Sequence, residues 1–444
     1  MLACLGLVTA ARAQEPLPGQ IAPQVVSRAD ARQSYAIYLP TSYDRSRAWP
    51  VIFIFDPGAR GRDAVERLRP AAEQFGYVVA GSNNSRNGPA EPQYQAMLAM
   101  INDASQRTSL DPRRVYVAGL SGGARVAFRT ALMARVRGVL ACSAGLPGDA
   151  ELPAKVPFAV FGTTGPTDFN FSEMKRLDFA LEDRAATHRL VNTGGGHAWA
   201  TPDVLLQAVE WFELEAMRGG VRPKDEKIIG AALAARLQAL PAAPVPARWQ
   251  ALQALARDFQ GLADVSTQEK QAKELEKSRE VAAWRRADRK AVDRETAYVE
   301  ELMDAESDGD VVFIKRISGE LRRMLAGPAD SEDHLMARRV ITDFNGRARS
   351  AIRRMFQDGA YSDAEAVLDA MTAFDPTDAR SHYDLARARG YLGDRKGCLA
   401  ALTAAVKAGY ANATQAAAEP AFAKFREEAA FKSVLGSISQ PATL

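Results

Sequence analysis

The stretch RVYVAGLSGGARVA, residues 114–127, joins an apolar run typical of a β-strand to a glycine-rich turn and a run of helix-forming residues. At its centre, GLSGG at 119–123 matches the pattern G-x-S-x-G. In that pattern a serine lies on a sharp turn between a strand and a helix, with its hydroxyl exposed as a nucleophile. Gly119 and Gly123 carry no Cβ that would crowd the strand against the helix, and glycine adopts positive φ at little cost. The segment therefore predicts a strand–turn–helix unit with Ser121 as the candidate nucleophile.

Short β-type runs alternate with helical runs between about residues 33 and 218. This alternation predicts a mainly parallel sheet with helices on both faces. The runs VIFIF at 51–55 and FAVFG at 158–162 are apolar at every position, as expected of strands buried on both faces. The expected strands are residues 34–39, 50–55, 77–81, 114–118, 138–143, 157–162 and 187–192, and the expected helices are 62–75, 94–107, 122–134, 172–185 and 202–217.

The composition changes after Gly219-Gly220, where β-type runs nearly vanish and Ala, Leu, Glu, Lys and Arg dominate to the end of the chain. A length of 444 residues also exceeds what one hydrophobic core usually supports. We therefore expect an α/β sheet domain over residues 14–220, a helical linking region over 221–337 and an all-helical domain over 338–444.

The last helical region contains a repeat with a period of 34 residues. Its first unit has Gly359, Ala364, Leu368 and Met371, and its second has Gly393, Cys398, Leu402 and Ala405 at the same spacing. A helix–turn–helix period of this length, with small residues where two helices touch, resembles the tetratricopeptide repeat. Because such stacks need about three repeats for stability, the helices before Arg338 or the tail 419–435 are expected to extend this one. The resemblance implies that the region holds a protein partner or braces the enzyme.

The N-terminal segment MLACLGLVTAARA, residues 1–13, is apolar and ends in Ala11-Arg12-Ala13. It fits the apolar region and the A-x-A cleavage site of a secretory signal, which predicts a periplasmic or secreted protein; a buried N-terminal strand is the alternative. No later stretch has 18 consecutive apolar residues, so no membrane span is expected. Cys142 and Cys398 fall in different expected domains, and a disulfide framework is not expected.

The charges and motifs exclude several functional classes. The chain has 57 basic and 54 acidic residues spread along its length, so no electrostatic footprint for nucleic acid is expected. It has no Cys, His and Asp cluster with metal-ligand spacing, no P-loop and no G-x-G-x-x-G motif. We therefore expect neither a metal nor a cofactor.

A serine nucleophile needs a base, because its free hydroxyl attacks poorly at neutral pH. His197 lies in the loop GGGHAW, residues 194–199, between the last expected strand and the last helix, whereas His188 starts a strand. The base in turn needs a carboxylate that orients it. Asp168 follows the strand 157–162 in a loop at the same edge of the sheet, while Asp178 and Asp183 fall within the next helix. The order Ser121, Asp168, His197 is the order found in α/β-hydrolases.

The tetrahedral oxyanion of acyl transfer is usually stabilised by two backbone amides. We expect Gly122 to supply one, and Gly58 or Ala59 of the loop after VIFIF to supply the other, since Pro57 has no amide hydrogen. Asn83 of the polar segment 82–87 and Trp199 are the candidate substrate-binding residues, with Phe169 and Phe171 beside them. Only about a dozen residues separate the strand ending at 143 from the next strand, so a helical lid has no room and an open site is expected.

Residues from about 33 to 217 resemble the α/β-hydrolase superfamily. The runs LDPRRVYVAGLS at 110–121 and GHAW at 196–199 are similar to segments of polyhydroxybutyrate-depolymerase-like and feruloyl-esterase-like enzymes. The sequence departs from those enzymes at Asp56-Pro57, where they commonly have His-Gly. The resemblance implies the roles of nucleophile, acid and base for Ser121, Asp168 and His197.

The function expected from these observations is hydrolysis of a small or polymeric carboxylic ester by an exported enzyme through an acyl-enzyme. Two alternatives remain open. One is a catalytically degenerate hydrolase scaffold that binds a protein partner through the helical repeats, since fold alone does not imply activity. The other is a serine peptidase of the same fold, because the same triad cleaves esters and amides.

Overall fold

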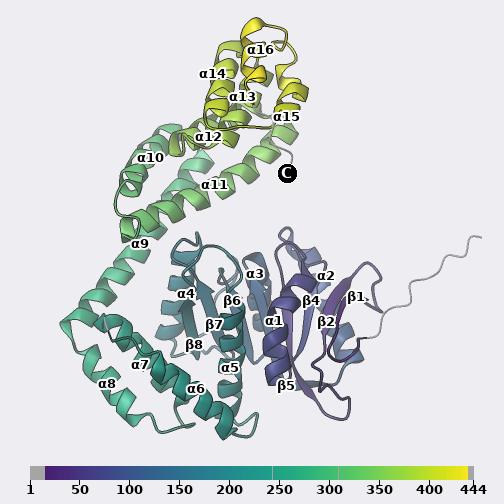
Figure 1. Cartoon of the computed structure of the whole chain (residues 1–444), viewed down its shortest axis with the longest axis vertical. Helices are drawn as coiled ribbons and strands as arrows, with labels where there is room; N and C mark the ends of the chain where they lie inside the picture. Colours follow the sequence, from purple (N-terminus) through teal and green to yellow (C-terminus); the bar gives the residue numbers. More distant parts are fainter. Residues whose placement is uncertain (1–15, 243, 309, 439–444) are drawn as a thin grey trace, which may run out of the picture. The chain divides into compact units, whose positions relative to one another are not determined.

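The computed structural model describes residues 16–242, 244–308 and 310–438. Its first part contains an eight-stranded sheet with the strand order β1-β2-β4-β3-β5-β6-β7-β8 (Figure 1). β1 and β2 pair antiparallel with each other, β2 pairs antiparallel with β4, and all pairs from β4 to β8 are parallel. The strands are β1 (Ile21–Val26), β2 (Ser34–Tyr38), β3 (Trp49–Phe55), β4 (Val78–Ser82), β5 (Leu110–Leu120), β6 (Gly138–Cys142), β7 (Ala159–Thr164) and β8 (His188–Asn192).

Helices cover both faces of this sheet (Figure 1). α1 (Gly61–Phe75) and α5 (Pro202–Arg218) share one hydrophobic core with Ile52 and Ile54 of β3. α2 (Ala90–Arg107), α3 (Gly122–Met133) and α4 (Phe171–Asp183) share the opposite core with Phe53 and Phe55. The strand β3 thus buries alternate side chains on the two faces, which is why its sequence is apolar throughout.

The structure confirms the predicted fold class, a mainly parallel sheet with helices on both faces followed by an all-helical region. All seven predicted strands and all five predicted helices are present, and α2 begins four residues earlier than expected. The sequence pattern missed β1 (Ile21–Val26) at the edge of the sheet. Pro23 and the exposed Gln24 interrupt its apolar pattern, and an edge strand tolerates both.

The next helices belong to the same compact unit as the sheet, and this unit extends to Val292. They are α6 (Glu226–Gln238), α7 (Val245–Phe259), α8 (Ser266–Glu276) and the first part of α9 (Arg279–Asp308). Asp258 of α7 holds them to the sheet: its buried carboxylate accepts a hydrogen bond of 2.7 Å from Trp211 Nε1 of α5 and hydrogen bonds from Arg189 of β8 and Arg236 of α6. The unit boundary therefore differs from the predicted boundaries at 220 and 337, because these helices pack against the edge of the sheet.

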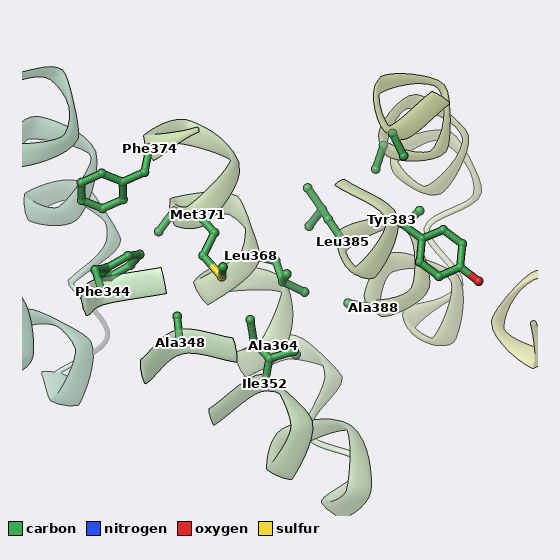
Figure 2. Packing of buried hydrophobic residues seen from close by; sticks show 14 of the residues in the cluster. Phe344, Ala348, Ile352, Ala364, Leu368, Met371, Phe374, Tyr383, Leu385 and Ala388 are labelled. Atoms are coloured by element: carbon green, nitrogen blue, oxygen red, sulfur yellow. The ribbon is translucent and has the colours of Figure 1, made fainter. Parts of the chain in front are cut away.

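A second compact unit begins at Asp293, within α9. Its further helices are α10 (Val311–Leu325), α11 (Glu332–Asp358), α12 (Tyr361–Phe374), α13 (Ala379–Leu392), α14 (Arg395–Lys407), α15 (Ala413–Ala418), the short 3₁₀ helix Pro420–Phe422 and α16 (Ala429–Gly436). The ring of Phe344 in α11 lies 4.5 Å from that of Phe374 in α12, centroid to centroid, and Ile352 packs near Ala364 (Figure 2). A buried ion pair between Arg339 and Glu295 joins α11 to α9, with Nε and Oε2 2.9 Å apart.

The 34-residue period has a structural counterpart in two helix pairs, α11–α12 and α13–α14. Gly359 and Gly393 both end the first helix of a pair in the left-handed conformation, with φ of 75° and 79°. The remaining repeat positions are buried on the second helices, at Ala364, Leu368 and Met371 of α12 and at Cys398, Leu402 and Ala405 of α14. The same core includes Leu302 and Ile317 before the pairs and Phe431 after them. Helices on both sides therefore extend the stack, while its resemblance to the tetratricopeptide repeat stays a prediction.

The predicted signal segment, residues 1–13, lies outside the residues that the structure describes. Among the described residues, no helix combines the length and apolar character needed to cross a bilayer. Cys142 and Cys398 are buried free thiols.

Candidate active site

The predicted strand–turn–helix unit is present, with Ser121 between β5 and α3. Ser121 has φ of 53° and ψ of −125°, a strained conformation for a residue with a side chain, and its amide donates to the carbonyl of Cys142 at 2.8 Å. A Cβ on Gly119 would lie 2.2 Å from the backbone of Gly123, and a Cβ on Gly123 would lie 2.0 Å from the carbonyl oxygen of Phe55. Both glycines are therefore required by backbone contacts between β5, α3 and β3.

We predict that Gly123→Ala lowers the free energy of unfolding by about 3 kcal/mol or more, at or beyond the upper end of the usual cost of overpacking. The added methyl group meets the backbone of the central strand β3, which cannot move aside as a flexible side chain could. The measurement is thermal or urea unfolding of the purified variant. Gly148→Ala is the matched control, because its Cβ would have nothing within 4 Å; equal stability of the two variants would contradict the packing argument.

The structure brings His197 and Asp168 together. His197 Nδ1 lies 2.8 Å from Asp168 Oδ1, and the carboxylate is fully buried while the imidazole is 20% exposed. The same Oδ1 accepts from the amide of Asn170 at 2.9 Å, which fixes its orientation. A carboxylate at Nδ1 holds the proton on that nitrogen and leaves Nε2 as the basic atom. The pair thus has the arrangement that a general base requires.

Small residues let the Asp168 loop and the His197 loop touch. A Cβ on Gly165 would lie 1.9 Å from the carbonyl oxygen of Gly195, and the amide of Thr167 donates to that same oxygen at 3.3 Å. On the other side, the ring of Phe169 stacks on the imidazole with centroids 3.9 Å apart. The imidazole is therefore held by a carboxylate at one edge and an aromatic ring against its face.

Ser143 connects the turn of Ser121 to the loop of His197. It follows Cys142, whose carbonyl binds the Ser121 amide, and its own hydroxyl donates to the carbonyl of Ala198 at 3.2 Å. Ser143 also has positive φ, 59°, and its carbonyl accepts from Asn170 Nδ2 at 2.7 Å. Within the described residues the Ser121 hydroxyl makes no hydrogen bond to His197, a bond that is often long in resting enzymes and tightens when substrate binds.

The sequence did not predict that Ser143 and Asn170 would connect the turn of Ser121 to the loops of Asp168 and His197. Ser143 is one small polar residue after an apolar strand, and its positive φ has no signature in the sequence. Asn170 follows two residues after Asp168, a spacing at which an Asx-type turn could have been suspected.

Asp56 organises the loop after β3 and ties it to the His197 loop. Its buried carboxylate accepts from Arg60 Nε at 2.8 Å and from Trp199 Nε1 at 3.0 Å. Burial alone would raise the pKa of Asp56, but the hydrogen bonds from Arg60, Trp199 and the Gly58 amide outweigh it and lower the pKa. Asp56 is therefore an ionised structural residue at the position where the resembling enzymes commonly have His.

The two amides that were expected to bind the oxyanion, those of Gly58 and Ala59, donate hydrogen bonds within the loop after β3 instead. The Gly58 amide donates to Asp56 Oδ1 at 2.8 Å, and the Ala59 amide donates to the carbonyl of Asp56 at 3.0 Å. The turn that these bonds close also places Ala59 at a φ of 60°. In this conformation neither amide is free to donate to a substrate, which corrects the expectation from the sequence.

The polar segment 82–87 meets the site through Asn87. A Cβ on Gly122 would lie 1.9 Å from Asn87 Oδ1. Asn83 serves the scaffold instead: its Nδ2 donates to the carbonyl of Pro23 at 3.1 Å, and its Oδ1 lies 2.5 Å from where a Gly61 Cβ would be. Asn87 of this segment thus lies beside the turn of Ser121, whereas the contacts of Asn83 are with β1 and α1. Trp199 is half-buried, and its indole N–H donates to the carboxylate of Asp56.

Asp178, Asp183 and His188 were rejected as members of the triad, and a helical lid and a metal site were not expected. Asp178 and Asp183 lie in α4, and His188 Nε2 pairs with Asp178 Oδ1 at 3.3 Å, so neither His188 nor Asp178 joins the Asp168–His197 pair. No helix lies between β6 and β7, as expected for a site without a helical lid. In the described part of the chain, no group of three or more His, Cys, Asp or Glu side chains is placed to hold a metal.

No protein-family model matches this chain, and no curated protein matches it. Among solved structures, it is similar to the Staphylococcus aureus fluorophosphonate-binding serine hydrolase FphF, with 14% identity over 44% of this chain and 99% of that chain and a TM-score of 0.38. It is also similar to the S-formylglutathione hydrolase FrmB of the same species, with 13% identity, coverage of 45% and 99% and a TM-score of 0.37. An esterase of Pyrobaculum calidifontis matches at 15% identity, with coverage of 45% and 87% and a TM-score of 0.37.

Proposed function

We propose that this protein is an exported serine hydrolase that cleaves carboxylic esters through an acyl-enzyme. The observation that carries the proposal is the contact of His197 with the buried carboxylate of Asp168, 2.8 Å apart, joined through Ser143 to the strained turn of Ser121. All three side chains follow the carboxyl ends of parallel strands, where α/β sheets bind their ligands. Fold alone would not support a function, whereas a serine on a sharp turn with a histidine held by a carboxylate is the arrangement that nucleophilic catalysis uses.

In the proposed reaction, Ser121 Oγ attacks the ester carbonyl while His197 Nε2 takes the hydroxyl proton. The tetrahedral oxyanion accepts a hydrogen bond from the Gly122 amide, the first of helix α3. Collapse of the intermediate breaks the bond to the alcohol, which leaves with the proton from His197. A water molecule, deprotonated by His197, then attacks the acyl-enzyme and releases the acid with Ser121 restored. The Asp168 carboxylate stabilises the imidazolium that forms on His197.

The substrate class follows from the site and its surroundings. The lack of a helix between β6 and β7 and the exposure of Asn87 favour an open site that admits small esters or the end of a polymer chain. Acyl transfer of this kind needs no metal or cofactor. Export rests on the N-terminal segment 1–13, and a protein partner for the repeats rests on their resemblance to tetratricopeptide units.

The experiment that tests the proposal is labelling of the purified chain with a fluorophosphonate, followed by peptide mapping. We expect one stoichiometric adduct on Ser121, because a phosphonylating reagent needs a serine activated by its base. Prior heating should abolish the adduct, which separates active-site labelling from reaction with exposed hydroxyls.

A panel of p-nitrophenyl acetate, butyrate and octanoate and a matched p-nitroanilide then separates the esterase from the peptidase. Turnover of the esters with far slower turnover of the anilide supports the proposal. Labelling on Ser121 with faster anilide cleavage would identify a peptidase, and no labelling in the folded protein would favour the binding scaffold.

A further inference from the structure

The geometry points to the side-chain amide of Asn87 as the second hydrogen-bond donor to the oxyanion. The two amides of the loop after β3 that were expected to supply that donor, Gly58 and Ala59, are bonded within the loop, and Pro57 has none. Asn87 comes from the loop after β4, on the other side of β3 from Ser121. The inference rests on the proposed function and identifies a further catalytic residue for it.

Asn87 lies beside Gly122, whose amide is the proposed first donor. A Cβ on Gly122 would be 1.9 Å from Asn87 Oδ1 and 3.5 Å from its Nδ2. Adding the bond length of about 1.5 Å places Oδ1 within about 3.4 Å of the Gly122 Cα. An oxyanion lies about 2.7–3.1 Å from each of its donors, so one oxygen atom can reach both the Gly122 amide and the end of the Asn87 side chain.

The Asn87 backbone is anchored, which gives its side chain a defined position. The Asn87 amide donates to the carbonyl of Pro57 at 2.9 Å, and the neighbouring Arg86 forms an antiparallel bridge with Gly58. On either side of Asn87, the carbonyls of Arg86 and Gly88 accept hydrogen bonds from Gln93 Nε2, at 2.9 Å and 3.1 Å. The loop is thus fixed at both ends of the residue that faces Gly122.

The chemistry requires Nδ2 to face the oxyanion, whereas Oδ1 faces Gly122 in the resting structure. A half-turn about the Cβ–Cγ bond exchanges the two atoms with little change in shape, and this torsion is broad and roughly two-fold. Asn87 is exposed, so solvent allows that rotation. Negative charge developing on the substrate oxygen favours the orientation that presents the N–H group.

We expect Asn87→Ala to lower kcat for p-nitrophenyl butyrate by about 10²–10³ with KM changed less than threefold, the effect of losing one oxyanion donor. Asn87→Asp keeps the shape, offers no donor and adds a charge that repels the oxyanion, so its loss should be at least as large. The rate of inactivation by a fluorophosphonate should fall in parallel in both variants. Arg86→Ala is the matched control, since it removes the adjacent exposed side chain and keeps the backbone bridge to Gly58.

A second route to the same donor uses Gly122→Ala, which keeps the backbone amide and puts a methyl group 1.9 Å from Asn87 Oδ1. The variant should displace the carboxamide and reproduce the kcat loss of Asn87→Ala. Because both changes remove one interaction, the double variant should be no slower than about the slower single variant, and the energies should not add. Thermal unfolding of each variant confirms that it is folded.

The outcomes separate this inference from the function beneath it. Ser121-dependent turnover with a kcat in Asn87→Ala within fivefold of the parent would overturn the role of Asn87 and leave the hydrolase standing. A raised KM with unchanged kcat would also overturn it, because Asn87 would then bind the ground state. Absence of any Ser121-dependent turnover or labelling in the folded parent would overturn both.

Discussion

Replacing Ser121 with alanine should lower kcat for p-nitrophenyl butyrate by about 10⁴–10⁶, the range seen when the nucleophile of a serine triad is removed. The turn that presents the hydroxyl is held by the hydrogen bond from the Ser121 amide to the carbonyl of Cys142 and by the close backbone contacts of Gly119 and Gly123, so alanine should keep the turn and lose the hydroxyl alone. Removing the hydroxyl also removes the proposed nucleophile of the acyl-enzyme. The measurement is steady-state hydrolysis, together with loss of the fluorophosphonate adduct.

Ser143→Ala is the matched control for this variant. Ser143 is also a serine directly after a buried parallel strand, it also has positive φ, and within the described residues its hydroxyl donates to the carbonyl of Ala198 alone. The loss of one neutral hydrogen bond is worth about 0.5–1.5 kcal/mol, so kcat should fall by about tenfold at most. More than one per cent of parental activity in Ser121→Ala, after re-purification from a host without background esterase, would contradict the assignment.

The parts of the site that the sequence predicted are those that topology determines. In a parallel sheet the residue after each strand lies at the same edge, so Ser121 after β5, Asp168 after β7 and His197 after β8 were placed in one region by counting strands. The need for Gly119 and Gly123 followed from the sharpness of one local turn. Each of these inferences used short-range geometry and a regular element.

The parts that the sequence did not predict depend on which hydrogen-bond partner each polar group finds, near or far along the chain. Nothing local distinguishes Asn83 from Asn87, yet Asn83 donates to the carbonyl of Pro23 in β1 and Asn87 faces Gly122. The amide of Gly58 was expected to be free, but the carboxylate of Asp56, two residues earlier, accepts its hydrogen bond. The predicted boundary after residue 220 likewise ignored Asp258, whose carboxylate joins three elements far apart in the sequence.

Replacing Asp168 with asparagine should lower kcat by about 10⁴ while leaving the fold intact, as expected when a base loses the carboxylate that fixes its tautomer. The carboxylate is fully buried and its Oδ1 accepts from both His197 Nδ1 and the Asn170 amide. An asparagine has the same shape and costs less to bury than a charge, so thermal unfolding should be little changed. Its side-chain N–H, turned toward the imidazole, would favour the tautomer with the proton on Nε2, which cannot accept the Ser121 proton.

Asp178→Asn is the matched control, because it tests whether the loss of any carboxylate that contacts a histidine would lower kcat. Asp178 lies in α4, it too contacts a histidine, with Oδ1 3.3 Å from His188 Nε2, and its removal should change kcat by less than about threefold, the small effect expected of a partly exposed ion pair. The two substitutions remove the same charge from carboxylates that both face an imidazole, so their effects on the net charge of the protein are equal. A large loss in Asp168→Asn alone therefore reports the specific orientation of His197. Equal losses of kcat in the two variants would mean that kcat depends on the net charge of the sheet domain. The assignment of Asp168 as the acid of the triad would then be wrong.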